Sequence, residues 1–157
     1  MAEVRGKRQT LMASIEIGGG RLAQRGWINL DPTHGTGPWQ RLAQDTPWPT
    51  GDHTIEGIRA SHVMEHIPAG APRIAVMNEA HRVLHPGGVF EIRVPNALSG
   101  TWHAFADPTH VSFWCVESFH YLDGTKAAHA DYGLKPWKTR ELRIQGDNEI
   151  LWIGSPR

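Results

Sequence analysis

The stretch from Ile55 to Asn96 constrains the fold more than any other part of the chain. Residues 55–61 have the length and apolar content of a strand, and residues 89–94 predict a second one. Between them, apolar side chains from Pro72 onward recur at the 3.6-residue spacing of an amphipathic helix, which Pro86–Gly88 ends. A strand, a helix and a strand within about forty residues predict a βαβ unit. We therefore expect a parallel sheet whose functional residues lie at the carboxyl ends of its strands.

Length and charge limit the classes of protein that fit. The 157 residues suffice for one domain, which we expect to span residues 1–157. The 16 Lys and Arg balance the 16 Asp and Glu, so nucleic acid is not a favoured partner. The sequence has no apolar run of membrane-spanning length and no signal-peptide core, so we expect a cytoplasmic protein without a membrane partner. The lone Cys115 excludes an internal disulfide.

Two candidate ligand-binding features lie near the start of the chain. Residues 11–17 predict a strand that leads into Gly18-Gly19-Gly20, where the main chain can turn sharply and approach a ligand. A plain turn remains the alternative for a glycine triplet. Residues 27–31 predict a second strand with Asp31 at its carboxyl end, where nucleotide-binding α/β folds hold ribose hydroxyls. Asp31 could instead cap the turn at Pro32.

The connection between these two strands is unusually short. Only Arg21 to Gly26 separate them, whereas the usual nucleotide-binding fold places its acid about 20 residues after the glycines. We therefore expect the first crossover helix to be shortened or absent. The strand at 89–94 places Glu91 and Arg93 on one face, where a fully buried parallel strand would be apolar. This predicts a thinly covered sheet face, open either to solvent or to another subunit of a homo-oligomer.

The remaining patterns complete the predicted fold. Residues 39–45 are interpreted as a further strand, before a rigid Pro47-Trp48-Pro49 segment in which Trp48 either lines a ligand site or plugs the sheet edge. Residues 139–144 and 149–153 flank a glycine-containing turn and predict a β-hairpin. The predicted class is therefore α/β, a Rossmann-like, mostly parallel sheet with an antiparallel C-terminal hairpin.

The loop from Asn96 to Asp123 follows the carboxyl end of a predicted strand, where loops carry chemistry in open α/β sheets. It is rich in His and aromatic residues and includes a predicted short helix at 116–122. Five side chains with metal-binding chemistry come from this loop and from the core unit: His103, Asp107, His110, Glu65 and His66. Their spacing matches no closed metal motif, and we assign no metal site from the sequence.

Five pieces of the chain, in order, resemble the small class I S-adenosylmethionine-dependent methyltransferases of the type 11-like group. They are Glu16–Gly20, Gly26–Asp31, Pro47–Pro49, Ala60–Ile67 and His81–Gly88. The resemblance covers residues 15–96 well and residue 102 to the end more loosely. It implies a seven-stranded sheet whose last strand is antiparallel, with S-adenosylmethionine lying across the strand ends.

The resemblance also implies roles for individual residues. Gly18, Gly19 and Gly20 would line the methionine part of the donor, and Glu16 would orient that loop or reach the donor's amino group. Asp31 would bind the ribose hydroxyls, and Ser61 and His62 would lie beneath the sulfonium. Asp45 is the nearest match to the acid that contacts adenine, although it is displaced along the chain.

Methyl transfer from a sulfonium needs alignment more than covalent chemistry, which agrees with the absence of a nucleophile motif. A hydroxyl or nitrogen acceptor needs its proton removed, and a histidine can do this near neutral pH. The candidate bases are His110 first, His66 second and His62 third. The acceptor is unidentified, and a small molecule, a sugar and a protein all remain open.

Three alternatives compete with this prediction. The first is a catalytically inactive methyltransferase-like scaffold that acts through protein partners, which the shortened crossover favours. The second is a nicotinamide-dependent oxidoreductase, but Ala23 stands where its glycine fingerprint places the third glycine. The third is a metal-dependent hydrolase built on the His-rich loop.

Overall fold

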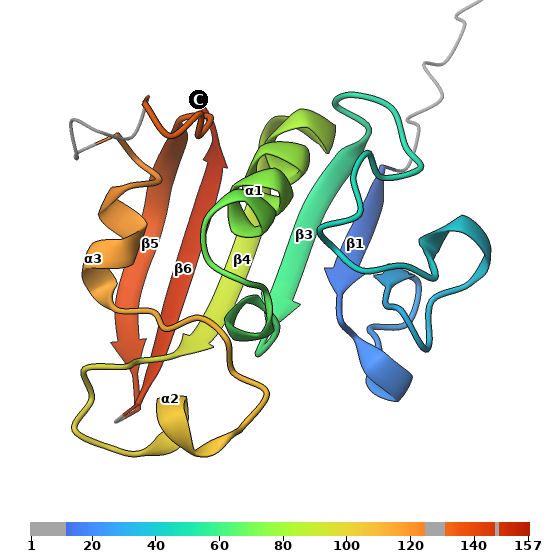
Figure 1. The fold of residues 1–157 in the computed structure, drawn as a ribbon. Coiled ribbons are helices and arrows are strands. Elements are labelled where there is room, and N and C mark those ends of the chain that lie inside the picture. The colour runs from blue at the N-terminus through green and yellow to red at the C-terminus, as the bar shows by residue number, and fades with distance from the viewer. Residues whose placement is uncertain (1–11, 125–130, 147) are drawn as a thin grey trace, which may run out of the picture.

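The computed structural model describes residues 12–124, 131–146 and 148–157, which form one six-stranded sheet with helices packed against it (Figure 1). The strands are β1 (Ala13–Ile17), β2 (Ile28–Leu30), β3 (Ile55–Ser61), β4 (Leu84–Pro95), β5 (Trp137–Gln145) and β6 (Glu149–Pro156). The α-helices are α1 (Ala71–Val83), α2 (His103–Ala106) and α3 (Val116–His120), and short 3-10 helices are η1 (Gly20–Leu22), η2 (Gly37–Trp39) and η3 (Met64–His66).

The sheet order is β2-β1-β3-β4-β6-β5. Strands β1 to β4 pair in parallel, and β6 pairs antiparallel with both β4 and β5. The predicted class, a mostly parallel Rossmann-like sheet closed by an antiparallel C-terminal hairpin, is therefore confirmed. The β3-α1-β4 unit matches the predicted strand, helix and strand. Asp147, in the predicted hairpin turn, lies outside the described residues.

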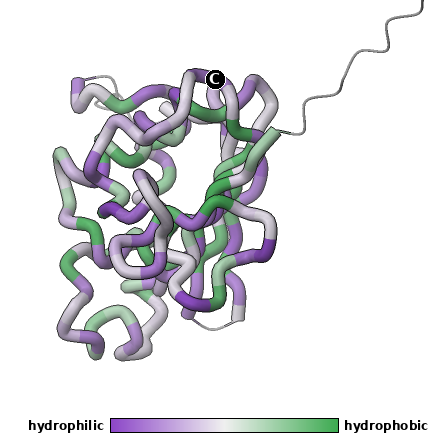
Figure 2. Tube along the Cα trace, turned by 90° about the vertical axis from the view of Figure 1, so that its right-hand side faces the viewer, coloured by the Kyte–Doolittle hydropathy of each residue, from purple (hydrophilic) through white to green (hydrophobic). Residues whose placement is uncertain are grey.

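The main core lies between the sheet and α1, which crosses in front of β4 in Figure 1. The apolar side of α1 is fully buried at Val76, Met77 and Ala80, as its periodicity predicts. Aromatic side chains extend this core under α3, where the Phe119 and Trp152 rings stack with centroids 5.7 Å apart. Figure 2 shows the hydrophobic residues concentrated along the strands.

The opposite face of the sheet carries ion pairs. Glu16 of β1 bonds Arg59 of β3, and Arg93 donates to Glu91 along β4 at 2.8 Å. The Glu91 and Arg93 side chains are 27% and 34% exposed. The sequence alternation that predicts a thinly covered face agrees with this exposure. Whether solvent or a second subunit covers the face stays a prediction.

Two sequence expectations about the strands are wrong. Residues 39–45 form no strand: Trp39 ends η2, and the segment that follows is irregular because the Arg41 guanidinium binds the main-chain oxygens of Asp45 and Pro47. Trp48 beside it is 2% exposed, so it is a core residue and not a ligand wall. The seven-stranded sheet that the resemblance implies is also wrong for the described residues, where β2 forms one edge of a six-stranded sheet.

Two further details concern connections. The first crossover is reduced to η1, a 3-10 turn of 3 residues, which confirms the expected loss of that helix. Strand β4 starts at Leu84, earlier than residue 89, because Leu84 already pairs with Ile55 before the Pro86–Gly88 irregularity shifts the register.

Candidate functional site

The carboxyl ends of β1, β2, β3 and β4 meet at one edge of the sheet because the four strands are parallel. The segments that leave these ends form the candidate site. They are the glycine loop at 18–20, the turn after Asp31, the segment His62–His66 and the loop from Asn96 to Trp114.

The glycine loop is held by hydrogen bonds to β2. Gly18 adopts a φ of +63° and donates its N–H to the Leu30 carbonyl at 2.8 Å. The Asn29 side chain accepts from the Gly19 N–H at 3.2 Å and donates to the Gly20 carbonyl at 3.0 Å. Gly20 also has a positive φ, and a Cβ placed on it would meet no atom within 4 Å. The loop therefore presents open backbone at Gly20, as a close-approach loop requires.

Asp31 lies directly beside this loop and is 7% exposed. Its Oδ2 accepts the Gly20 N–H at 3.0 Å, and its Oδ1 accepts the N–H groups of Thr33 and His34 at 2.8 and 2.7 Å. Burial opposes its negative charge, but the three N–H donors and the nearby His34 outweigh burial and lower the pKa of Asp31. The structure thus joins the two predicted donor-binding features, and the carboxylate caps its own turn as well.

Glu16 of β1 stabilises the chain next to the same loop. Its carboxylate pairs with Arg59 at 2.7 Å and accepts the N–H of Gln24. The Arg59 guanidinium in turn lies 5.3 Å from the Trp27 ring centroid. Glu16 therefore fixes the chain that follows the glycine triplet, and its predicted role in donor binding stays a prediction.

His62 begins the segment after β3, next to Ser61, and has a φ of +55°. Its Nδ1 lies 3.4 Å from Glu65 Oε1, and its Nε2 bonds Glu149 Oε2 at 2.8 Å. These carboxylates, Glu65 first, raise the pKa of His62 against the opposing effect of burial. Because both of its ring nitrogens face carboxylates, a charged His62 is poorly placed to accept a proton from a methyl acceptor.

A cavity of about 440 Å³ opens at this edge of the sheet. Its lining includes His62, Pro95, Trp102, Asp107, His110 and Glu149. The rings of His66 and His110 meet edge to face, with centroids 4.8 Å apart. The structure therefore brings the three predicted histidines together beside one cavity, although they come from two distant parts of the chain.

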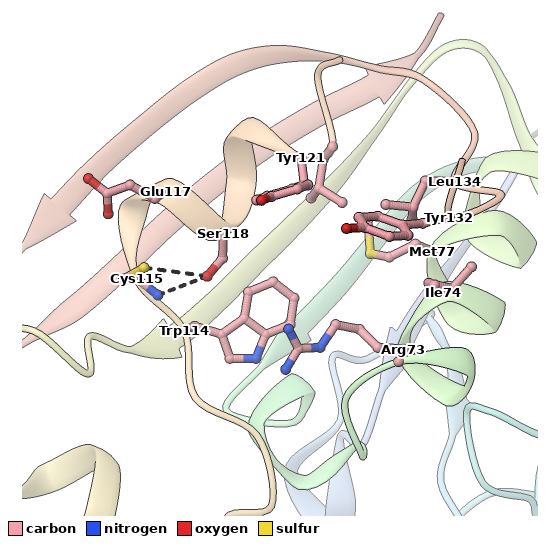
Figure 3. Close-up of a pocket in the computed structure, with 12 residues that line it drawn as sticks. Arg73, Ile74, Met77, Trp114, Cys115, Glu117, Ser118, Tyr121, Tyr132 and Leu134 are labelled. Atoms are coloured by element: carbon pink, nitrogen blue, oxygen red, sulfur yellow. Dashed lines mark hydrogen bonds between the residues drawn. The ribbon is translucent and has the colours of Figure 1, made fainter. Parts of the chain in front are cut away.

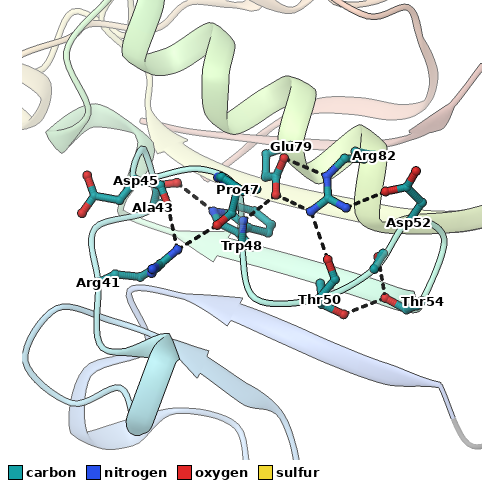
Figure 4. Close-up of polar contacts among 11 residues, drawn as sticks. Arg41, Ala43, Asp45, Pro47, Trp48, Thr50, Asp52, Thr54, Glu79 and Arg82 are labelled. Carbon is teal, nitrogen blue, oxygen red and sulfur yellow. Dashed lines mark hydrogen bonds and ion pairs between the residues drawn. The ribbon is translucent and has the colours of Figure 1, made fainter.

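Asp45 and His103 do not belong to this group of three histidines, although His103 lines the same cavity. Asp45 is exposed on the loop before Trp48, and its main-chain oxygen binds Arg41 (Figure 4). Its predicted adenine contact stays a prediction. The His103 ring stacks on Trp102 at 4.5 Å and is not part of the cluster formed by Glu65, His66 and His110.

A second cavity, of about 510 Å³, has no counterpart among the predicted site residues. It lies between α1 and α3, where Arg73 stands 4.0 Å from the Trp114 ring centroid (Figure 3). Burial lowers the pKa of Arg73. No sequence pattern predicts this cavity, because its walls come from α1, α3 and residues 132–134, which only the tertiary fold brings together.

Among the described residues, no helix combines the length and apolar character needed to cross a membrane.

The comparisons with known proteins concern the fold. No family model and no curated protein matches the sequence. The fold, however, is that of the class I S-adenosylmethionine-dependent methyltransferases, which solved structures show over nearly the whole chain.

Three solved structures illustrate the similarity. The PH0226 protein from Pyrococcus horikoshii OT3 has a TM-score of 0.61 at 13% identity, over 93% of this chain and 82% of that one. A SAM-dependent methyltransferase from Aquifex aeolicus has a TM-score of 0.58 at 11% identity, over 91% and 81%. The Burkholderia thailandensis 1,6-didemethyltoxoflavin-N1-methyltransferase, with bound 1,6-didemethyltoxoflavin and S-adenosylhomocysteine, has a TM-score of 0.63 at 12% identity, over 92% and 71%.

Proposed function

We propose that this protein binds S-adenosylmethionine and transfers its methyl group to an acceptor in the His-lined cavity. The observation that carries the proposal is the contact between Gly18 and Val63, since a Cβ on Gly18 would lie 2.5 Å from Val63 Cγ2. That contact sets the glycine loop beside the segment that begins at His62. The glycine loop, Asp31 and the cavity therefore lie at one edge of the sheet.

The donor side of the proposal rests on the open backbone at Gly20 and the adjoining Asp31. Gly20 leaves space for the methionine part, and Asp31, with its lowered pKa, stays an acceptor for ribose hydroxyls at neutral pH. Asp31 already accepts three N–H groups, so ribose would bind its remaining lone pair or displace one of them.

The acceptor side rests on the 440 Å³ cavity, which fits a small molecule or a single protruding group of a larger one. His110 is the best placed base, because it lines the cavity and its Nδ1 bonds the Ala104 carbonyl at 2.9 Å. That bond assigns the proton to Nδ1 and leaves Nε2 free to accept one. A positioned base of this kind contributes roughly 10²–10⁴-fold to the rate.

Calorimetric titration with S-adenosylmethionine and S-adenosylhomocysteine tests the donor site. Gly20→Asn is the informative variant, since Asn tolerates a positive φ and its side chain would fill the open space. Gly87→Asn is the matched control, because Gly87 also has a positive φ and free space but lies at the amino end of β4. We expect binding by the wild type and Gly87→Asn, and at least about tenfold weaker binding by Gly20→Asn.

A specific observation favours one alternative, the scaffold that no longer catalyses. Both donor-site carboxylates are engaged within the chain, Glu16 by Arg59 and Asp31 by three N–H groups. The absence of binding to either compound by the wild type would favour the scaffold and reject the enzyme.

A further inference from the structure

Glu65, His66 and His110 converge beside the cavity. Each offers one ligand atom, and these atoms all lie within 4.8 Å of one another. Glu65 and His66 belong to η3, while His110 comes from the loop after α2. The main chains are joined as well, since the N–H groups of Val111 and Ser112 donate to the Glu65 carbonyl at 2.9 and 3.0 Å. The three side chains are therefore held together by the fold.

The Glu65 carboxylate has no hydrogen-bond partner within the described part of the chain. The residue is 1% exposed, and both of its side-chain oxygens are buried without a partner. His62 Nδ1 stands 3.4 Å from Oε1 as an ion pair, without a hydrogen bond. A buried carboxylate without a hydrogen bond is costly, and the half-exposed His62 ring 3.4 Å away compensates it only in part, so a bound cation would stabilise Glu65 further.

Each of the two histidines keeps one ring nitrogen without a proton. His110 donates from Nδ1 to the Ala104 carbonyl at 2.9 Å, so its Nε2, 4.0 Å from Glu65 Oε1, carries no proton in the neutral ring. His66 Nδ1 lies 3.2 Å from the Thr109 carbonyl.

The Thr109 hydroxyl settles the direction of the second bond to His66. Its single proton goes to Asp107 Oδ1 at 2.6 Å, so toward His66 Nδ1, 3.1 Å away, the hydroxyl can only accept. Nδ1 of His66 therefore carries the proton and Nε2 is bare. Histidines that bind metals show this pattern, with one ring nitrogen donating to a carbonyl or carboxylate network and the other free.

We propose that Glu65, His66 and His110 bind one divalent transition-metal ion of the Zn²⁺ or Fe²⁺ class. Two imidazole nitrogens and one carboxylate oxygen suit such ions, and three protein ligands leave positions open. With metal–ligand distances of about 2.1 Å, the ligand atoms of a tetrahedral site lie roughly 3.4 Å apart. Because the ligand atoms here lie up to 4.8 Å apart, metal binding requires them to approach one another by roughly 1.4 Å, and the exposed His66 side chain has room to move.

The open positions would face the cavity, since His110 and Asp107 line it. A cation there would act as a Lewis acid on an acceptor oxygen. The Lewis-acid role depends on the proposed methyl transfer. The binding of the metal does not depend on it. The competing occupant of His110 Nε2, 4.0 Å from Glu65 and 3.8 Å from Asp107, is the proton that this atom would take up as the proposed base, because one lone pair cannot bind a metal and a proton at once.

Titration of the full, chelator-treated chain with ZnCl₂ in a calorimeter tests the proposal, with Co²⁺ absorption as a second probe of ligand geometry. We expect one Zn²⁺ per chain, and binding at least about tenfold weaker in Glu65→Gln, His66→Gln and His110→Gln. His103→Gln is the matched control, because His103 comes from the same loop and lines the same cavity but lies outside the cluster. It should bind as the wild type does.

Two results would overturn the proposal. One is no Zn²⁺ binding by the wild type, which would assign the site to a proton. The other is equal affinity in the wild type, Glu65→Gln and His110→Gln. Circular dichroism of each variant without metal checks folding, and the exposed His66 provides a variant that leaves the core intact. S-adenosylhomocysteine binding is measured separately, so failure of the metal site and failure of the proposed function remain distinguishable.

Discussion

Gly18 packs against Val63 so closely that any side chain at position 18 would overlap Val63 Cγ2. The contact joins the loop after β1 to the segment after β3. Position 18 is therefore a glycine because packing against Val63 leaves no room for a side chain. Gly20 differs, because the space beside it is empty. Within one glycine triplet, Gly18 is therefore needed for packing, whereas Gly20 leaves space in which a ligand can bind.

Gly18→Ala should lower the free energy of unfolding by about 2–4 kcal/mol, since it adds a strained positive φ and an overlap with Val63. Urea denaturation measures the loss. Val63→Ala in the same chain should recover about 1 kcal/mol of it, because the overlap disappears while the strain remains. Strictly additive effects of the two substitutions would show that the two side chains do not meet.

Glu79 anchors the irregular segment that replaces the expected third strand (Figure 4). Its Oε1 accepts the Trp48 N–H at 2.6 Å, and both of its oxygens bind the Arg82 guanidinium. Glu79→Ala leaves the buried Trp48 N–H without a partner, so we expect a loss of about 2–3 kcal/mol in thermal or urea unfolding.

An exposed ion pair of the same chemistry is the control for that loss. Arg143 and Glu141 pair on β5, where their side chains are 53% and 43% exposed. Glu141→Ala should change the free energy of unfolding by less than about 1 kcal/mol. Equal losses at Glu79 and Glu141 would mean that the Trp48 contact contributes nothing.

The sequence could predict the elements that follow simple periodicity. The α1 helix, the alternation in β4 and the C-terminal hairpin each repeat at the spacing of their own geometry. The prediction of a strand at residues 39–45 was wrong because tertiary contacts determine the conformation of that segment. Arg41 binds two main-chain oxygens there, and Trp48 enters the core, neither of which a local pattern shows.

The candidate site was predictable in part for a similar reason. Parallel strands bring their carboxyl ends together, so the proximity of the glycine loop and Asp31 follows from the strand assignment alone. The burial of the Glu65 carboxylate does not follow from the strand assignment. Glutamate is rarely fully buried, and the main-chain bonds to Val111 and Ser112 that hold Glu65 in place join segments far apart in sequence.

Asp31→Ala should weaken binding of S-adenosylhomocysteine by about 1.5–3 kcal/mol, or roughly 10–150-fold, because it removes a charged hydrogen-bond acceptor. Calorimetry gives the affinity, and a thermal melt reports whether the turn after Asp31 still folds. Glu56→Ala, which removes an exposed carboxylate on β3, is the control. An unchanged affinity in a folded Asp31→Ala protein would remove Asp31 from the donor site.

Asp31 should also contribute to the dependence of stability on pH. Its pKa in the folded chain is lowered from 3.8, because Gly20, Thr33 and His34 donate N–H groups to its charged form. The resulting stability is present above pH 3.8 and is lost as the pH falls through the lowered folded pKa. Urea unfolding measured at a series of acidic pH values should therefore show a shallower decline for Asp31→Asn than for the wild type. If the two curves run parallel, the three N–H bonds do not favour the charged carboxylate.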